Sequence, residues 1–206
     1  DNDWIDADLS TEQGIEILIN KIKDWGIPDI IVANVYLRSN SIKLKNINSS
    51  SVPLINNNLE HLFQLIPICI EEQRKNKFGR WIGISSMISK MGGPGQSIYS
   101  MQKSALESLF KTIAIEEGKN GITANTISPG IIESPGAKSN YPNELLDTFS
   151  KMNLIGRAGK EEDVASAVLF LASPISSYIT GVDIPVCGGY NLSWGIQYAL
   201  EGKLNL

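Results

Sequence analysis

The sequence is poor in the residues that metal sites and disulfides require. Its 206 residues include two cysteines and one histidine, too few to make up a zinc site of the usual cysteine and histidine ligands, so we expect no metal. Cys69 and Cys187 both lie in apolar surroundings, and we expect them to be reduced and buried rather than joined in a disulfide. This use of cysteine favours a cytoplasmic protein.

Long apolar runs and an excess of one charge are also absent. The 18 basic and 22 acidic residues leave a net charge of −4, which disfavours nucleic acid and membrane surfaces as partners. The longest apolar stretch, residues 59–70, is interrupted by Glu60, His61, Gln64 and Pro67, and is therefore too short and too polar to cross a bilayer. No signal peptide is visible. The 42% hydrophobic content suits one globular domain over residues 1–206.

Short apolar runs alternate with amphipathic stretches along the chain. The short runs predict buried parallel strands at 29–33, 81–85, 122–127 and 184–186. The amphipathic stretches predict helices from Ser10 or Thr11 to Trp25, over 53–77 with a bend at Pro67, over 99–119 and over 161–172. This alternation indicates an α/β fold, a parallel sheet with helices on both faces. The segment 131–152 contains no clear strand and is rich in Pro, Ser and Asn, which suits a substrate lid.

A tyrosine and a lysine lie one helical turn apart in the predicted helix 99–119. Residues four apart share one face of a helix, so Tyr99 and Lys103 stack about 6 Å apart along the axis. A nearby cation lowers the pKa of a phenol from its usual value near ~10, towards the range useful for acid and base catalysis. Taken alone this pair is more often an ordinary surface contact.

Polar or glycine-containing corners follow three of the predicted strands. Asn34, Ser85 with Ser86, and Pro129 with Gly130 each stand where a strand ends. Ligands of open parallel sheets bind at the carboxyl ends of the strands, and the helix after the second strand brings Tyr99 towards that edge. A serine after a strand is usually a turn or helix cap; the conjunction is what points to a site.

At these positions the sequence resembles the classical short-chain dehydrogenases/reductases, most clearly the 3-oxoacyl-[acyl-carrier-protein] reductase branch. The resemblance covers Asp8 to Gly189 and is carried by the segments ISSMISKMGGPGQSIYSMQKSALE and NTISPGIIES. Ser86 precedes Tyr99 by thirteen residues, and Lys103 follows it by four. The family implies a Rossmann-type, doubly wound parallel sheet in a three-layer α/β/α arrangement.

The resemblance also implies a mechanism and a set of catalytic residues. Tyr99 would exchange a proton with the carbonyl oxygen of the substrate, while a nicotinamide exchanges hydride with the carbon. Lys103 would lower the pKa of the phenol and hold the nicotinamide ribose, and Ser86 would polarise the carbonyl oxygen. Asn58 would anchor a water of the proton relay, although it stands in a run of asparagines for which helix capping is the simpler interpretation.

The remaining implied positions bind NADP or NAD, with NADPH slightly preferred. Asp8 and Leu9 would meet the adenine, Ala33 and Asn34 the ribose region, and Ser134 the carboxamide or phosphates. Pro129, Gly130 and Ile132 would line the nicotinamide end, Ile132 through its backbone. The activity implied is reduction of a ketone or 3-oxoacyl group, including acyl thioesters, to a secondary alcohol, or the reverse oxidation.

The sequence departs from the family in two places. Where the family usually has two asparagines, alanine and glycine, this chain reads Ala33-Asn34-Val35-Tyr36; the tyrosine could narrow the cofactor groove or turn the loop outward. No TGxxxGxG-type loop occurs anywhere, although the family carries one on its first strand-helix-strand unit, which would precede Asp8. Three explanations stay open: an incomplete record of a normal enzyme, a chain completed by another polypeptide, or a non-catalytic structural or regulatory subunit that has lost nucleotide binding.

Association of identical chains is a further expectation. The predicted helices 53–77 and 99–119 correspond to those that pack across a two-fold axis in the family, and both carry broad apolar stripes. We expect a homotetramer, with a homodimer next. The alternative is that these stripes only cover the sheet.

Overall fold

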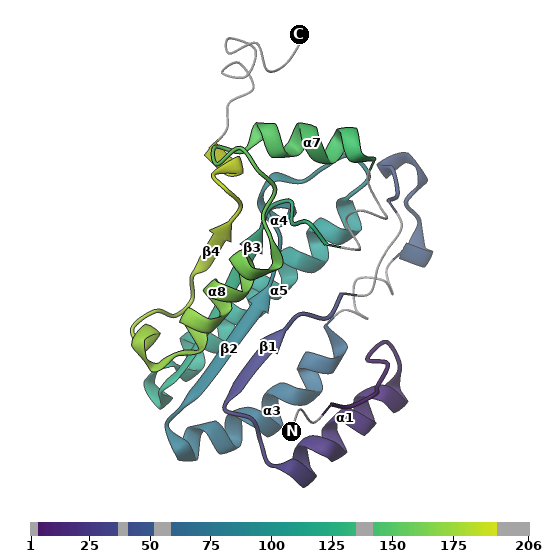
Figure 1. Ribbon diagram of the computed structural model, residues 1–206. Coiled ribbons are helices and arrows are strands. Elements are labelled where there is room, and N and C mark those ends of the chain that lie inside the picture. Colours follow the sequence, from purple (N-terminus) through teal and green to yellow (C-terminus); the bar gives the residue numbers. More distant parts are fainter. Residues whose placement is uncertain (1–3, 37–40, 52–58, 135–141, 193–206) are drawn as a thin grey trace.

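The computed structural model describes residues 4–36, 41–51, 59–134 and 142–192. Its four strands are β1 (Ile30–Ala33), β2 (Gly79–Ile84), β3 (Ile122–Pro129) and β4 (Asp183–Val186). They form one parallel sheet in the order β1-β2-β3-β4, with Val32 beside Ile82 and Ile82 beside Asn125. Because all strands run the same way, their carboxyl ends share one edge of the sheet (Figure 1).

Helices connect the strands and cover both faces of the sheet. In chain order they are α1 (Glu12–Trp25), α3 (Glu60–Asn76), α4 (Ile88–Met91), α5 (Ser97–Glu117), α7 (Asn143–Met152) and α8 (Glu161–Ala172). Short 3-10 turns lie at 44–46, 49–51, 118–120, 174–176 and 190–192. None of the helices in the described part of the chain is both long and apolar enough to span a bilayer.

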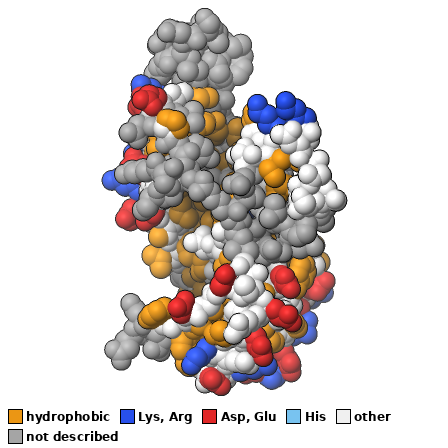
Figure 2. Space-filling view, turned by 90° about the vertical axis from the view of Figure 1, so that its right-hand side faces the viewer, with side chains coloured by type: hydrophobic (Ala, Val, Ile, Leu, Met, Phe, Trp, Pro, Cys, Tyr) orange, Lys and Arg blue, Asp and Glu red, His pale blue; other side chains and the backbone are white. Residues whose placement is uncertain are grey.

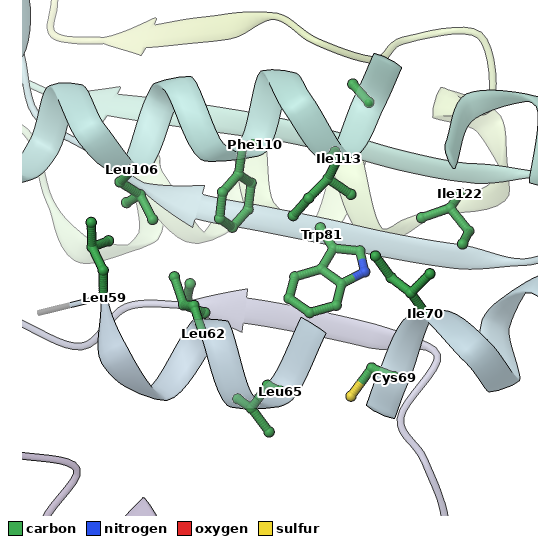
Figure 3. Packing of buried hydrophobic residues seen from close by; sticks show 13 residues of the cluster. Leu59, Leu62, Leu65, Cys69, Ile70, Trp81, Leu106, Phe110, Ile113 and Ile122 are labelled. Atoms are coloured by element: carbon green, nitrogen blue, oxygen red, sulfur yellow. The ribbon is translucent and has the colours of Figure 1, made fainter. Parts of the chain in front are cut away.

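Successive residues of a strand point to opposite faces, and β2 shows the result directly. Trp81 packs on the face covered by α3 and α5, against Phe110 of α5 at 6.3 Å between ring centroids. Figure 3 shows this cluster between the two helices and the sheet. Ile82 points the other way, to a second cluster with Leu171 of α8. Two cores on the two faces make three layers, which confirms the predicted α/β/α class.

The first helix begins where the sequence predicts. The Thr11 side chain accepts a hydrogen bond from the amide of Gly14 at 3.1 Å, a regular N-cap. The turn before it is tight, because a Cβ on Gly14 would lie 1.9 Å from the carbonyl oxygen of Asp8. Acidic and basic side chains are interspersed over the lower part of the molecule, where α1 lies (Figure 2), without a continuous patch of either sign.

The strand β1 differs from its prediction as a strand buried on both faces. Ile30 and Val32 are 44% and 43% exposed, while Ala33 on the opposite face is buried. The reason is topological: β1 lies at an edge of the described sheet, and the described helices cover only its Ala33 face. The apolar run correctly predicts a strand here, but it does not predict which faces of the strand other elements cover.

The structure contains two helices that the sequence patterns did not predict. The short α4 lies between the serine pair and the glycines that precede α5, and α7 occupies the end of the segment proposed as a lid. Both cysteines are buried and unpaired, as predicted.

Candidate active site

The carboxyl end of β2 is tied to its neighbours by backbone hydrogen bonds. The amide of Ser85 donates to Ile127 at 2.7 Å, and the amide of Met87 donates to Pro129 at 3.1 Å. Ser86 lies between these two anchors, with its hydroxyl oxygen 3.3 Å from the amide of Ile88 at the start of α4. The serine side chain is therefore held at the sheet edge by fixed backbone on both sides.

Lys103 lies in the second turn of α5 and is almost fully buried. Its side chain reaches the end of β2, where Nζ donates a hydrogen bond to the carbonyl oxygen of Ile84 at 2.7 Å. Only 7% of the residue is exposed. Burial disfavours the charged ammonium and lowers the pKa of Lys103 to about 8. The predicted pairing with Tyr99 is present, with Nζ 5.9 Å from the centre of that ring.

A second aromatic ring lies over the same lysine. The ring of Tyr36, three residues past the end of β1, meets the Tyr99 ring edge to face at 4.9 Å between centroids. Nζ of Lys103 is 5.5 Å from the centre of the Tyr36 ring. The side chain of Tyr36 is therefore turned inward, towards Tyr99 and Lys103. The direction of its side chain depends on the backbone after β1, and no sequence signal fixes it.

The predicted cofactor positions nearest the start of the chain lie in the turn before α1 and at the end of β1. Asp8 and Leu9 belong to that turn, where the carbonyl oxygen of Asp8 accepts a hydrogen bond from the amide of Thr11 at 3.0 Å. The Asp8 carboxylate accepts hydrogen bonds from the amide and hydroxyl of Ser10, which lower its pKa. Ala33 closes β1, and Asn34 follows it in an exposed position. Asn58 lies outside the described residues.

On the far side of β2 the chain turns sharply after β3. The amide of Gly130 donates to Val186 at 3.0 Å, and a Cβ on Gly130 would lie 2.9 Å from Cα of Cys187. The next residues are held against the start of α8, where Ile132 bridges to Gly159. Pro129 thus ends β3, and the residues after it, up to Glu133, are held against Gly159.

Two hollows border these residues. A cavity of about 520 Å³ lies beside the glycine-rich turn between α4 and α5, and its apolar walls include Leu44, Pro94 and Met101. A second cavity of about 390 Å³ lies at the end of β4, lined among others by Ile131 and Val186. Each is adjacent to one of the predicted site segments.

A buried polar cluster beneath the site was not expected from the sequence. Glu107, one turn beyond Lys103 on α5, accepts a hydrogen bond from Ser85 at 2.6 Å, and Lys90 of α4 lies 3.6 Å from the same carboxylate oxygen. Lys90 also pairs with Asp183, which accepts from Ser128 at 2.8 Å. The signal that could have found it is the spacing 99, 103 and 107, which places three polar residues on one helix face.

The sequence matches a family model described as enoyl-(acyl carrier protein) reductase over residues 1–191. It is 31% identical over 191 residues to the 3-oxoacyl-[acyl-carrier-protein] reductase FabG of Haemophilus influenzae, covering 90% of this chain and 76% of that protein.

Solved structures resemble the fold at similar coverage. A protein described as a short chain dehydrogenase/reductase family protein has a TM-score of 0.80 and 28% identity, covering 91% of this chain and 76% of the other. A tyrosine-to-phenylalanine variant of ElxO with NADPH bound has a TM-score of 0.81 and 26% identity, covering 92% and 79%.

Proposed function

Because the chain belongs to the short-chain dehydrogenase/reductase family of NAD(P)-dependent enzymes, we propose that it reduces a ketone or 3-oxoacyl group to a secondary alcohol, or catalyses the reverse oxidation, with Tyr99 as the general acid and base. The observation that carries the proposal is the burial of Lys103 beside Tyr99 at the end of β2. Burial of the Lys103 ammonium beside Tyr99 costs free energy and lowers its pKa to about 8. Groups with pKa values shifted in this way are concentrated at functional sites.

The chain's own residues account for the proton. The positive charge of Lys103 favours the phenolate of Tyr99 and so eases transfer of the phenolic proton to the substrate oxygen. The Ser86 hydroxyl, held at the strand end, donates a hydrogen bond to that oxygen as negative charge develops on it. A bound nicotinamide supplies or accepts the hydride. The substrate carbonyl must therefore lie between Ser86 and Tyr99.

The residues at the sheet edge suit NADP or NAD, with NADPH slightly preferred. A lysine ammonium has three donors, of which Lys103 uses one on the carbonyl oxygen of Ile84 and keeps two for ribose hydroxyls. The close packing of Gly130 on Cys187 leaves a backbone turn without side-chain bulk beside the strand end. The NADPH in the ElxO structure supports the same choice. Asp8, Leu9, Asn34 and Ser134 keep their proposed contacts with the nucleotide.

An acyl chain suits the cavity of about 520 Å³ beside α5. Its walls are largely apolar, and Ser97 and Ser100 in the first turn of α5 line it together with Met101. Ser97 and Ser100 belong to the same first turn of α5 as Tyr99. The segment 131–152, of which α7 forms the end, remains the proposed lid, and acyl thioesters are the proposed substrates.

Turnover tests the proposal directly. The full-length protein is mixed with NADPH or NADH and a panel of 3-oxoacyl thioesters and ketones, and the absorbance of the reduced nicotinamide is followed. The Tyr99→Phe variant should bind the nucleotide within a few-fold of the wild type and lose about 10²- to 10⁴-fold in turnover. No turnover with any substrate and no binding of either nucleotide would sink the proposal.

A non-catalytic subunit is the alternative, and no observation favours it. It predicts that Tyr99→Phe leaves the cellular function intact, whereas the enzyme requires that hydroxyl. A homotetramer or homodimer remains proposed, supported by exposed apolar side chains on α3 and α5, namely Phe63, Met101 and Ile115. A cytoplasmic location likewise stays a prediction, supported by the two unpaired cysteines.

A further inference from the structure

Tyr36 covers the two residues that the proposed reaction needs most. Its ring lies edge to face on Tyr99 at 4.9 Å, and the Lys103 ammonium lies 5.5 Å from its centre. Nζ is thus flanked by two aromatic rings, both within the range of a cation–π contact. Tyr36 is itself 39% exposed, so its outer side is in solvent while its inner side covers the lysine.

The cavity beneath the Tyr36 ring is very small. The cavity lined by Tyr36, His61 and Lys103 measures about 10 Å³, too little to hold even one water securely. Lys103 Nζ already donates to Ile84, and 93% of the residue is covered, since only 7% is exposed. The Tyr36 ring is therefore one of the groups that a ribose hydroxyl would have to displace to reach this ammonium.

We propose that Tyr36 is a gate: its side chain closes over Tyr99 and Lys103 in the free protein, and swings out when the ribose of a nicotinamide nucleotide takes its place. The proposal rests on the proposed function for the identity of the nucleotide. The closed ring contacts must be broken before binding, so the nucleotide affinity measured is lower than that of the open form. Tyr36 thereby sets nucleotide affinity without taking part in the chemistry.

Covering of Lys103 can be measured without any cofactor. The wild type, Tyr36→Ala and Tyr36→Phe are treated at pH 10 with an amine-acylating reagent, and the labelling rate of Lys103 is followed by peptide mass spectrometry. Exposed Lys111 on the same helix serves as the internal reference. We expect Tyr36→Ala to raise the relative rate at Lys103 by about tenfold or more. Tyr36→Phe, which retains the ring, should stay close to the wild type.

Nucleotide affinity gives the second readout. Titration of the same proteins with NADPH and NADH should show roughly tenfold tighter binding for Tyr36→Ala, the factor expected for losing two aromatic contacts in the closed state. Tyr178→Ala removes a fully exposed tyrosine elsewhere and should change neither readout. Circular dichroism and urea unfolding verify that each variant is folded.

The outcomes separate the gate from the enzyme. An unchanged Lys103 labelling rate in Tyr36→Ala overturns the gate, whatever the nucleotide affinity of that variant. Nucleotide binding that is equally tight in wild type and Tyr36→Ala also overturns it. If no protein binds either nucleotide while Tyr36→Ala uncovers Lys103, the proposed function fails, and the assignment of the incoming group fails with it, but the cover over the lysine stands.

Discussion

Lys90 and Asp183 form an ion pair that joins α4 to the start of β4. The Asp183 side chain is 8% exposed and also accepts hydrogen bonds from Thr126 at 2.7 Å and Ser128 at 2.8 Å. Through Lys90 it is linked to Glu107, one turn beyond Lys103. Charged side chains on α4, α5 and β4 therefore hold together the elements next to the segment that carries Ser86.

Removal of the Asp183 charge should destabilise the protein. Asp183→Asn leaves Lys90 without its closest partner and weakens two hydroxyl hydrogen bonds, a loss of about 1–3 kcal/mol in the free energy of unfolding. Urea denaturation measures it. The matched control is Asp147→Asn, which breaks the Lys151 pair on α7, where both side chains are about 60% exposed; it should cost under about 0.5 kcal/mol. Equal losses in the two variants would contradict the structural role of the half-buried Lys90–Asp183 pair.

Lys103→Met should abolish turnover and yet stabilise the fold. At pH 7 the lysine is charged in both states, and burial of that charge costs roughly 1–3 kcal/mol after allowance for the lost hydrogen bond to Ile84. The pKa of Lys103 is about 8 when folded and near ~10.4 when unfolded. Between these values the native protein loses the proton first, so wild-type stability rises with pH and approaches that of the variant.

Urea unfolding of both proteins at pH 7 and pH 10 checks this prediction. The difference in the free energy of unfolding should shrink at the higher pH. A difference that is independent of pH would mean that the cost of Lys103 is not the burial of its charge.

Gly14→Ala should displace the turn that carries Asp8 and Leu9. The new methyl group would lie 1.9 Å from the Asp8 carbonyl oxygen, and relief of that overlap should cost about 1–3 kcal/mol. If these two residues contact the adenine, nucleotide affinity should fall as well. Gly118→Ala is the control, because nothing lies within 4 Å of its Cβ position; it should be neutral or slightly stabilising. Thermal unfolding and nucleotide titration of the two variants decide the matter.

Association should depend on the outer faces of α3 and α5. Phe63 is 62% and Ile115 is 81% exposed, and a glutamate at either position would place a charge in a contact made by these helices. Sedimentation velocity at micromolar concentration should show an oligomer for the wild type and a smaller species for Phe63→Glu. Leu44→Glu, on a turn outside both helices, should leave the assembly unchanged. A monomeric wild type would contradict the expectation.

Local sequence patterns predicted most of the fold, because strand runs and helix stripes are read over a few residues. The helix 161–172 has the predicted bounds, and the capping of α1 by Thr11 follows from side-chain chemistry alone. The strand β3 extends two residues past its predicted end, to Pro129, because it pairs with β4 there. α7 escaped prediction because a segment rich in Pro, Ser and Asn masks its helical spacing.

Spacing and the family resemblance point to Ser86, Tyr99 and Lys103 as site residues, and their roles stay predictions. In the structure Ser86 follows β2, and Lys103 lies beside Tyr99 and reaches the carbonyl oxygen of Ile84 at the end of β2. The depth of Lys103 and the inward turn of Tyr36 depend on contacts between α5 and the chain after β1, far apart in sequence. The exposure of Ile30 and Val32 depends likewise on which elements cover β1.

The strand order of the sheet has a consequence for how the chain folds. Because each strand of the described sheet pairs with its neighbours along the chain, this sheet can form by stepwise addition, each step closing a single strand-helix-strand loop. β2 and β3 are held on both edges within the described sheet, whereas β1 and β4 are each held on one. Backbone amides of β2 and β3 should therefore exchange with deuterium last, and those of β1 and β4 should open earlier.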